Sequence, residues 1–221
     1  MILPGQTLKP QDKAIRIGNG LAFIESTVFA IKAGELVSEE PNIFYINNVQ
    51  KRYVPEEHDF VIGIITSRLA DTYRVDIGSY QQASLSILGF EGATKRNRPD
   101  LKIGNLVFGI VIVGDKNKEP EITCLEILAE EHQFGQLKGG NMFNCSISLC
   151  RKMISNEYPL LEAIGKNLKF EICIGLNGRV WIAGENCKET ILISNSLVQC
   201  EFLDKKQINS VFKKLMNDLN K

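Results

Sequence analysis

Residues 90–99 read Phe-Glu-Gly-Ala-Thr-Lys-Arg-Asn-Arg-Pro. The cationic side chains in this stretch are those of Lys95, Arg96 and Arg98. Neither a helical nor an alternating apolar period runs through it, and glycine and proline interrupt it, which predicts an exposed loop. Apolar, strand-like segments over 82–88 and 106–113 flank it. The sequence therefore predicts that residues 90–99, the basic loop, protrude from a small β-barrel.

A cationic loop on a β-barrel suits binding to the phosphate backbone of a nucleic acid. Lysine and arginine displace the counterions that condense on such a backbone. We therefore expect Lys95, Arg96 and Arg98 to contact phosphates, with Asn97 between them as a polar contact. A charge run of this kind is also typical of an ordinary solvated loop. The run alone leaves both interpretations open.

The chain as a whole has the composition of an ordinary globular protein. It has 221 residues, of which 44% are hydrophobic and 24% are charged, as in typical soluble domains. Lysine plus arginine and aspartate plus glutamate both total 26, so the formal net charge is zero. Proteins that coat nucleic acid by bulk charge usually have a pI above about 9. Any contact with nucleic acid is therefore expected to be local, or shared with neighbouring subunits.

Sequence features that would direct the chain to a membrane or to a metal are absent. No segment approaches the ~20 apolar residues that span a bilayer, and the first residues lack the basic and apolar regions of a secretory signal. The six cysteines contain no Cys-x-x-Cys pair and mostly sit beside apolar residues, which predicts buried free thiols in a reducing compartment, the cytosol or nucleus. Only two histidines, His58 and His132, are present, which argues against a zinc site.

The first part of the chain is expected to be a small β domain over residues 1–55. Its strand candidates are 27–31, 35–37, 43–46 and 50–54, separated by glycine, proline and asparagine. Strands this short with such punctuation predict a small sandwich or barrel.

A second β module is expected over residues 56–128. Its strand candidates are 60–67, 72–77, 82–88, 106–113 and 121–125. Five short strands with one long connection match an OB-type barrel, which binds single strands on its open face and loops. Tyr73 and Arg74 could offer that face a stacking ring and a cation, and Arg68 a further cation. A half-buried strand aromatic and plain surface charges are the alternative interpretations.

A third module is expected over residues 137–221, after a polar connector at 130–138. The pattern predicts in turn a strand over 142–148, helices over 149–154 and 159–164, strands over 168–174 and 179–183, and a helix over 190–198. A last helical stripe begins near Ile208, behind a capping-box pattern at Asp204 and Gln207. The order β-α-α-β-β-α is that of a KH domain.

KH domains grip RNA through a Gly-x-x-Gly loop, which lies between the first two helices. Here that position holds residues 155–158, Ser-Asn-Glu-Tyr, with no glycine. The chain does contain Gly175-Leu176-Asn177-Gly178, but between two strands, where Asn-Gly is a strong hairpin signal. We therefore expect Gly175, Asn177 and Gly178 to form a structural turn, and the KH-like module to be a structural or docking piece.

Four segments together resemble one known family. They are residues 51–55, 90–99, 119–124 and 175–181. They occur in the order seen in the ribosomal-RNA-processing protein forty family, the third cap component of the RNA exosome. The resemblance implies a β-rich α+β multidomain fold: an N-terminal β domain, a central S1-type OB barrel and a C-terminal KH-like α/β domain. This chain departs from the family at His58, which stands where glycine usually precedes Asp59.

The resemblance also implies a function without catalysis. Cap subunits sit on a ring of RNase-PH-like subunits, and their S1 barrels surround the entrance through which single-stranded RNA passes to a separate nuclease. The expected partners are single-stranded RNA, the RNase-PH-like ring subunits, on which the N-terminal domain docks, and other S1/KH cap subunits. No catalytic residue, cofactor, metal or membrane is expected. The expected location is the nucleus and nucleolus, and also the cytoplasm.

Two other functions remain open on the sequence. The chain could be the S1-KH portion of a phosphorolytic exoribonuclease, whose chemistry needs clustered carboxylates or a phosphate pocket. The acidic pairs Asp71 with Asp76 and Glu119 with Glu121 have no third acid at useful spacing and are interpreted as solvated surface. The second alternative is a free-standing S1/KH RNA-binding factor, which zero net charge and the missing KH phosphate loop disfavour.

Overall fold

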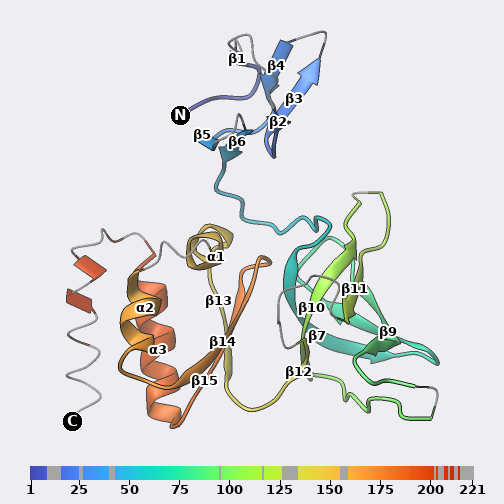
Figure 1. Ribbon diagram of the computed structural model, residues 1–221. Coiled ribbons are helices and arrows are strands. Elements are labelled where there is room, and N and C mark those ends of the chain that lie inside the picture. The colour runs from blue at the N-terminus through green and yellow to red at the C-terminus, as the bar shows by residue number, and fades with distance from the viewer. Residues whose placement is uncertain are drawn as a thin grey trace. The chain divides into compact units, whose positions relative to one another are not determined.

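The structure is a computed structural model that divides into two compact units, Met1–Gln50 and Lys51–Lys221 (Figure 1). It describes residues 1–8, 16–24, 27–39, 43–94, 96–115, 117–125, 134–154, 159–201, 203, 207–208, 210–211 and 214. Lys95 of the basic loop, the segment 155–158 and most of the expected last helix therefore lie outside the described residues. Within these ranges, no helix has the length and apolar character needed to cross a membrane.

The first unit is built from short strands, as expected. Its described strands are β1 (Thr7–Leu8), β2 (Arg16–Ile17), β3 (Leu21–Ile24), β4 (Thr27–Ala30), β5 (Glu35–Glu39) and β6 (Ile43–Asn47). They form two sheets, ordered β1-β4-β3 and β2-β6-β5. A small core of Leu21, Val28, Ala30 and Ile46 joins them. The strand expected over 50–54 is wrong: these residues form no strand, and Tyr53 packs into the barrel core of the second unit.

The second unit contains the expected OB-type barrel. Its strands are β7 (Phe60–Arg68), β8 (Thr72–Asp76), β9 (Ala83–Phe90), β10 (Leu106–Val113) and β11 (Glu121–Cys124). Antiparallel pairs run β9-β8-β7-β10-β11, and a parallel pair between β11 and β9 closes the ring. A further short strand, β12 (Gly135–Leu137), pairs with β10. The expectation of a plain connector over 130–138 is therefore wrong at its C-terminal end; residues 126–133 lie outside the described part.

Alternation along the strands explains why this barrel closes. In β8, Tyr73 and Val75 are fully buried while Thr72, Arg74 and Asp76 are partly exposed, because successive strand residues point to opposite faces. The inward set forms one apolar core with residues from the other strands: Val61, Ile65, Tyr73, Val75, Leu85, Val107, Val111 and Ile122. The basic loop leaves this core at Phe90, the end of β9, and the chain returns to it at Leu101, before β10 begins.

The rest of the second unit has the expected KH order. Its elements are β13 (Asn141–Asn144), α1 (Ile147–Ile154), α2 (Pro159–Gly165), β14 (Phe170–Gly175), β15 (Arg179–Gly184) and α3 (Cys187–Gln199). The sheet order is β13-β15-β14. The strand expected over 142–148 ends at Asn144 because Ser146 caps α1: its hydroxyl accepts the Leu149 N–H at 3.0 Å, as N-cap residues do. Residues 207, 208, 210, 211 and 214 are helical, and Asp204 lies outside the described residues.

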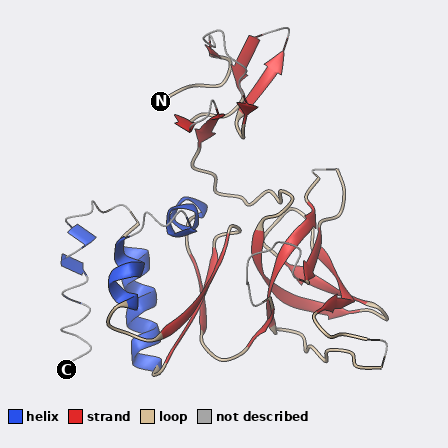
Figure 2. Cartoon of the chain, in the orientation of Figure 1, coloured by secondary structure: helices blue, strands red, loops and turns tan. Residues whose placement is uncertain are grey.

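The KH-type sheet is covered on both faces. Val180 and Ile182 of β15 pack with Ile193 of α3, and Figure 2 shows the helices against this side of the sheet. Trp181, between them in sequence, packs instead with Ile62 and Phe108 of the barrel. Three phenyl rings extend this second contact, with centroids 5.4–6.3 Å apart: Phe60, Phe108 and Phe134. The barrel and the KH-type module therefore share an apolar interface.

Candidate nucleic-acid interface

The basic loop contains a turn at which its two described arginines, Arg96 and Arg98, face solvent. Gly92 has a φ of +69°, a backbone conformation that favours glycine. Further on, the Thr94 N–H donates to the Asn97 carbonyl, and the Asn97 N–H donates to the Thr94 hydroxyl, both at 3.0 Å. This closed turn presents Arg96, Asn97 and Arg98 as exposed residues. These side chains are available to a polyanion.

Tyr73 anchors the loop from inside the barrel. Its ring is fully buried, its hydroxyl donates to the Pro99 carbonyl at 2.5 Å, and the Leu101 N–H donates to the same hydroxyl at 3.4 Å. The expectation that Tyr73 offers a stacking surface to a base is therefore wrong, because no face of the ring reaches solvent. The sequence did hold a signal for this burial. Tyr73 and Val75 are two residues apart in one strand, so their side chains point to the same face, which here is the inside of the barrel.

Two arginines near the loop form ion pairs with aspartates. Arg68, at the end of β7, lies 2.5 Å from Asp100, and Arg98 of the loop lies 3.5 Å from Asp71. The guanidinium of Arg68 also lies 5.8 Å from the centroid of the Tyr73 ring, a cation–π distance. Arg68 thus lies close to the anchoring tyrosine, and Arg98 directly precedes Pro99, whose carbonyl that tyrosine binds.

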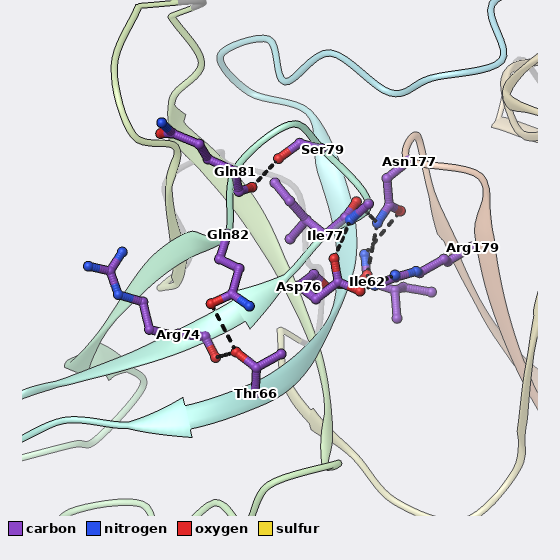
Figure 3. Close-up of polar contacts among 11 residues, drawn as sticks. Ile62, Thr66, Arg74, Asp76, Ile77, Ser79, Gln81, Gln82, Asn177 and Arg179 are labelled. Carbon is purple, nitrogen blue, oxygen red and sulfur yellow. Dashed lines mark hydrogen bonds and ion pairs between the residues drawn. The ribbon is translucent and has the colours of Figure 1, made fainter.

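Arg74 lies apart from the docking contacts of the KH-type module. Its guanidinium pairs with Glu119, and both side chains are partly exposed. The Thr66 hydroxyl donates to the Arg74 carbonyl at 3.1 Å. Figure 3 shows the Arg74 side chain directed away from Asn177 and Arg179. Arg74 therefore stays a candidate for RNA contact, but its guanidinium is already paired with Glu119.

The turn at residues 176–178 lies against the barrel. The Asn177 side-chain amide donates to the carbonyls of Ile62 and Ile77 at 2.8 and 2.9 Å, and its oxygen accepts the Ile62 N–H at 3.3 Å (Figure 3). Gly178 has a φ of +79°, and a Cβ there would lie 2.8 Å from the Cys145 carbonyl. Glycine and asparagine here make a turn whose asparagine side chain bonds the barrel backbone at Ile62 and Ile77.

An ion pair next to this turn strengthens the same contact. The Arg179 guanidinium lies 2.7 Å from the Asp76 carboxylate and donates to the Asp76 carbonyl at 2.5 Å. Partial burial alone would raise the pKa of Asp76, but hydrogen bonds from Arg179 and the Gly78 N–H outweigh it, and the pKa is lowered. Sequence reasoning interpreted Asp76 only as a solvated acidic residue and did not single out Arg179, because no local pattern pairs positions 103 residues apart.

A closed OB-type barrel joined to a KH-type module through buried contacts defines a modular RNA-binding class of protein. The family described as the S1 domain of exosome complex component RRP40 matches residues 53–135, and the KH domain family matches residues 140–188. Exosome component rrp40 of Schizosaccharomyces pombe is 42% identical over 205 residues, which cover 90% of this chain and 85% of that protein. Human exosome component RRP40 is 35% identical, with 90% and 74% covered.

The comparison with solved structures agrees in fold. A crystal structure assigned to an exosome complex RNA-binding protein superposes with a TM-score of 0.61 at 22% identity, covering 77% of this chain and 98% of its own. The chain belongs to the RRP40 family of exosome complex components.

Proposed function

We propose that this chain is a non-catalytic cap subunit of an RNA exosome, which guides single-stranded RNA into the pore entrance for 3′–5′ processing and degradation. The observation that carries the proposal is the geometry of the basic loop. Tyr73 fixes Pro99 and Leu101 from inside the barrel, while Arg96 and Arg98 stay exposed. Cations on a fixed backbone bind phosphates without reading base sequence, which suits an entrance that must accept many RNAs.

The proposal of a non-catalytic role is supported by the contacts of the carboxylates. Asp71 pairs with Arg98, and Asp76 pairs with Arg179. Glu119 pairs with Arg74. A hydrolytic or phosphorolytic site would instead need carboxylates converging on a shared metal or a positioned base. These three acidic side chains each form an ion pair with an arginine, and the three arginines lie on different segments of the chain.

The N-terminal unit is proposed to dock on RNase-PH-like ring subunits. Its exposed large apolar side chains include Leu3 at 57%, Phe23 at 63%, Ile24 at 52% and Ile31 at 53% of their full exposure. Exposed large apolar side chains of this kind can pack against a partner subunit. In this division of labour the first unit, Met1–Gln50, docks on the ring, residues 56–128 face RNA and other S1/KH cap subunits, and residues 137–221 support the barrel. Residues 51–55, expected as part of the N-terminal domain, belong to the second unit. The proposed location is the nucleus and nucleolus, and also the cytoplasm.

Assembly is tested by the size of the native complex. A tagged chain purified from cells should co-migrate with a large ring, and Phe23→Ser with Ile24→Ser should reduce that fraction. Val49→Ser, another exposed apolar change in the same unit, is the matched control. A wild-type chain that migrates at its own mass would instead favour a free-standing S1/KH factor.

RNA contact and the absence of catalysis are tested separately. In the reconstituted complex, single-stranded RNA carrying a photoreactive base should crosslink to the peptide that contains residues 96–98. Crosslinks confined to other subunits would contradict the assignment. The isolated chain, incubated with labelled RNA, Mg²⁺ and phosphate, should leave the RNA at full length. Shortening that co-purifies with the chain would favour the exoribonuclease.

A further inference from the structure

Two ion pairs link the end of the basic loop to the β7–β8 hairpin in a reciprocal pattern. Arg68, the last residue of β7, faces Asp100, which directly follows the loop, and Asp71 of the β7–β8 connection faces Arg98 of the loop. Each side therefore supplies one arginine and one aspartate. We call Arg68, Asp71, Arg98 and Asp100 the ion-pair quartet. All four side chains are solvent-exposed, those of the aspartates to 76% and 84%. The quartet lies on the surface proposed to meet RNA.

The quartet does not hold the loop in place. Buried contacts already do so, since the Tyr73 hydroxyl bonds both the Pro99 carbonyl and the Leu101 N–H, and Leu101 is itself buried. The β7–β8 connection is fixed in the same way by its backbone: the Ile87 N–H donates to the Asp71 carbonyl at 3.1 Å. Exposed ion pairs contribute little to folding by comparison. The four charged side chains are therefore not needed for the backbone conformation.

Resting on the proposed function, we propose that Asp71 and Asp100 act as internal counterions that RNA phosphates must displace from Arg98 and Arg68. A carboxylate and a phosphate compete for the same guanidinium face. Once displaced, each aspartate stays within about one Debye length (~8 Å) of the bound strand and repels it. Both effects lower the affinity of the barrel for RNA.

The same arrangement suits a surface over which RNA has to move. A strand bound by unpaired arginines would gain the full release of its counterions. An RNA strand that must displace Asp71 and Asp100 from the arginines gains less binding free energy. It also dissociates more readily, because the arginines pair with the aspartates again when it leaves. The quartet thus gives the barrel an affinity for RNA that is high enough to bind a strand and low enough to release it.

The test is RNA affinity after the aspartates lose their charge. Asp71→Asn with Asp100→Asn keeps side-chain size, and in the reconstituted complex it should tighten binding of a fluorescent single strand about three- to tenfold at low salt. It should also steepen the salt dependence of binding. Glu162→Gln is the matched control, because Glu162 is an exposed carboxylate paired with Lys166 at 2.7 Å in the KH-type module; it should change affinity less than about twofold.

Two outcomes overturn the inference. Weaker binding by the double variant, with unchanged thermal unfolding, would mean that the aspartates position the loop. Unchanged binding would mean that they do not compete with phosphate. Arg68→Ala with Arg98→Ala separates this failure from that of the proposed function: if these changes leave RNA binding unaltered, the loop assignment itself fails. If they weaken binding while the asparagine variants do not strengthen it, only the counterion inference fails.

Discussion

The side chain of Asn177 and the backbone of Ile62 form a two-way hydrogen bond between the KH-type module and the barrel. The amide donates to the Ile62 carbonyl at 2.8 Å, and the amide oxygen accepts the Ile62 N–H at 3.3 Å. The remaining amide hydrogen reaches the Ile77 carbonyl. Asn177 is buried, so its polar atoms are satisfied by the barrel rather than by water. The turn expected from sequence therefore also joins two modules.

Removing the Asn177 side chain should destabilise the second unit strongly. Asn177→Ala removes three hydrogen bonds to buried backbone groups of Ile62 and Ile77, and of these groups the Ile62 carbonyl keeps a side-chain donor, Arg179 at 3.3 Å. The expected cost is about 3 kcal/mol in the free energy of unfolding. Urea denaturation measures it. Asn167→Ala is the control, because Asn167 is exposed and donates only to the Ala163 carbonyl. Equal effects of the two changes would contradict the docking role.

Alanine substitutions at two glycines distinguish backbone strain from steric crowding as causes of lost stability. Gly178 and Gly104 have φ angles of +79° and +89°, but only at Gly178 would a Cβ meet another group, the Cys145 carbonyl at 2.8 Å. Gly104→Ala should therefore cost about 1 kcal/mol of stability from strain alone, and Gly178→Ala clearly more. Thermal unfolding of both variants measures the difference. A smaller loss at Gly178 than at Gly104 would show that the close approach does not constrain the turn.

His58 should be improved by glycine. Among the residues that the structure describes, it alone has a positive φ without being glycine, at 70°, and glycine adopts this backbone conformation without strain. His58→Gly removes left-handed backbone strain of about 1 kcal/mol. Glycine also gives the unfolded chain more conformational freedom, which lowers stability by a smaller amount. We expect a net rise in melting temperature. A fall would mean that imidazole contacts outweigh the strain.

The contact of Asp76 with Arg179 predicts a pH dependence. A lowered folded-state pKa means that the ionised carboxylate stabilises the fold above its unfolded pKa of about 3.9, and that this contribution is lost as pH falls through the folded value. Asp76→Asn should thus be less stable than wild type at pH 7, and the difference should shrink below pH ~4. Chemical denaturation at a series of pH values measures it, and a constant difference would exclude the linkage.

The architecture was predictable where local pattern decides it. Alternating apolar runs predicted the barrel strands, and Asn177-Gly178 predicted the β14–β15 hairpin. The strand β12 was missed because it is three residues long and carries the exposed Gln136. The strand expected over 50–54 fails for a tertiary reason, since Tyr53 packs into the barrel and its hydroxyl donates to Asp59 at 2.7 Å.

The site was predictable only in part. Exposure of Arg96 and Arg98 follows from loop composition, and the burial of Tyr73 follows from strand parity, which the interpretation of a stacking ring overlooked. The partners of these side chains could not be predicted. Asp71 and Arg98 are 27 residues apart, and Asn177 and Ile62 are 115 apart, and only the folded chain brings such pairs together.

If the basic loop binds RNA through phosphates, the affinity must depend on salt through its three cations. The measurement is the affinity of the reconstituted complex for a single strand across a salt series, for wild type and for Lys95→Ala with Arg96→Ala and Arg98→Ala. Losing three phosphate contacts should weaken binding. It should also make the negative slope of log affinity against log salt shallower by about 2. An unchanged slope would mean that these three cations do not contact RNA phosphates.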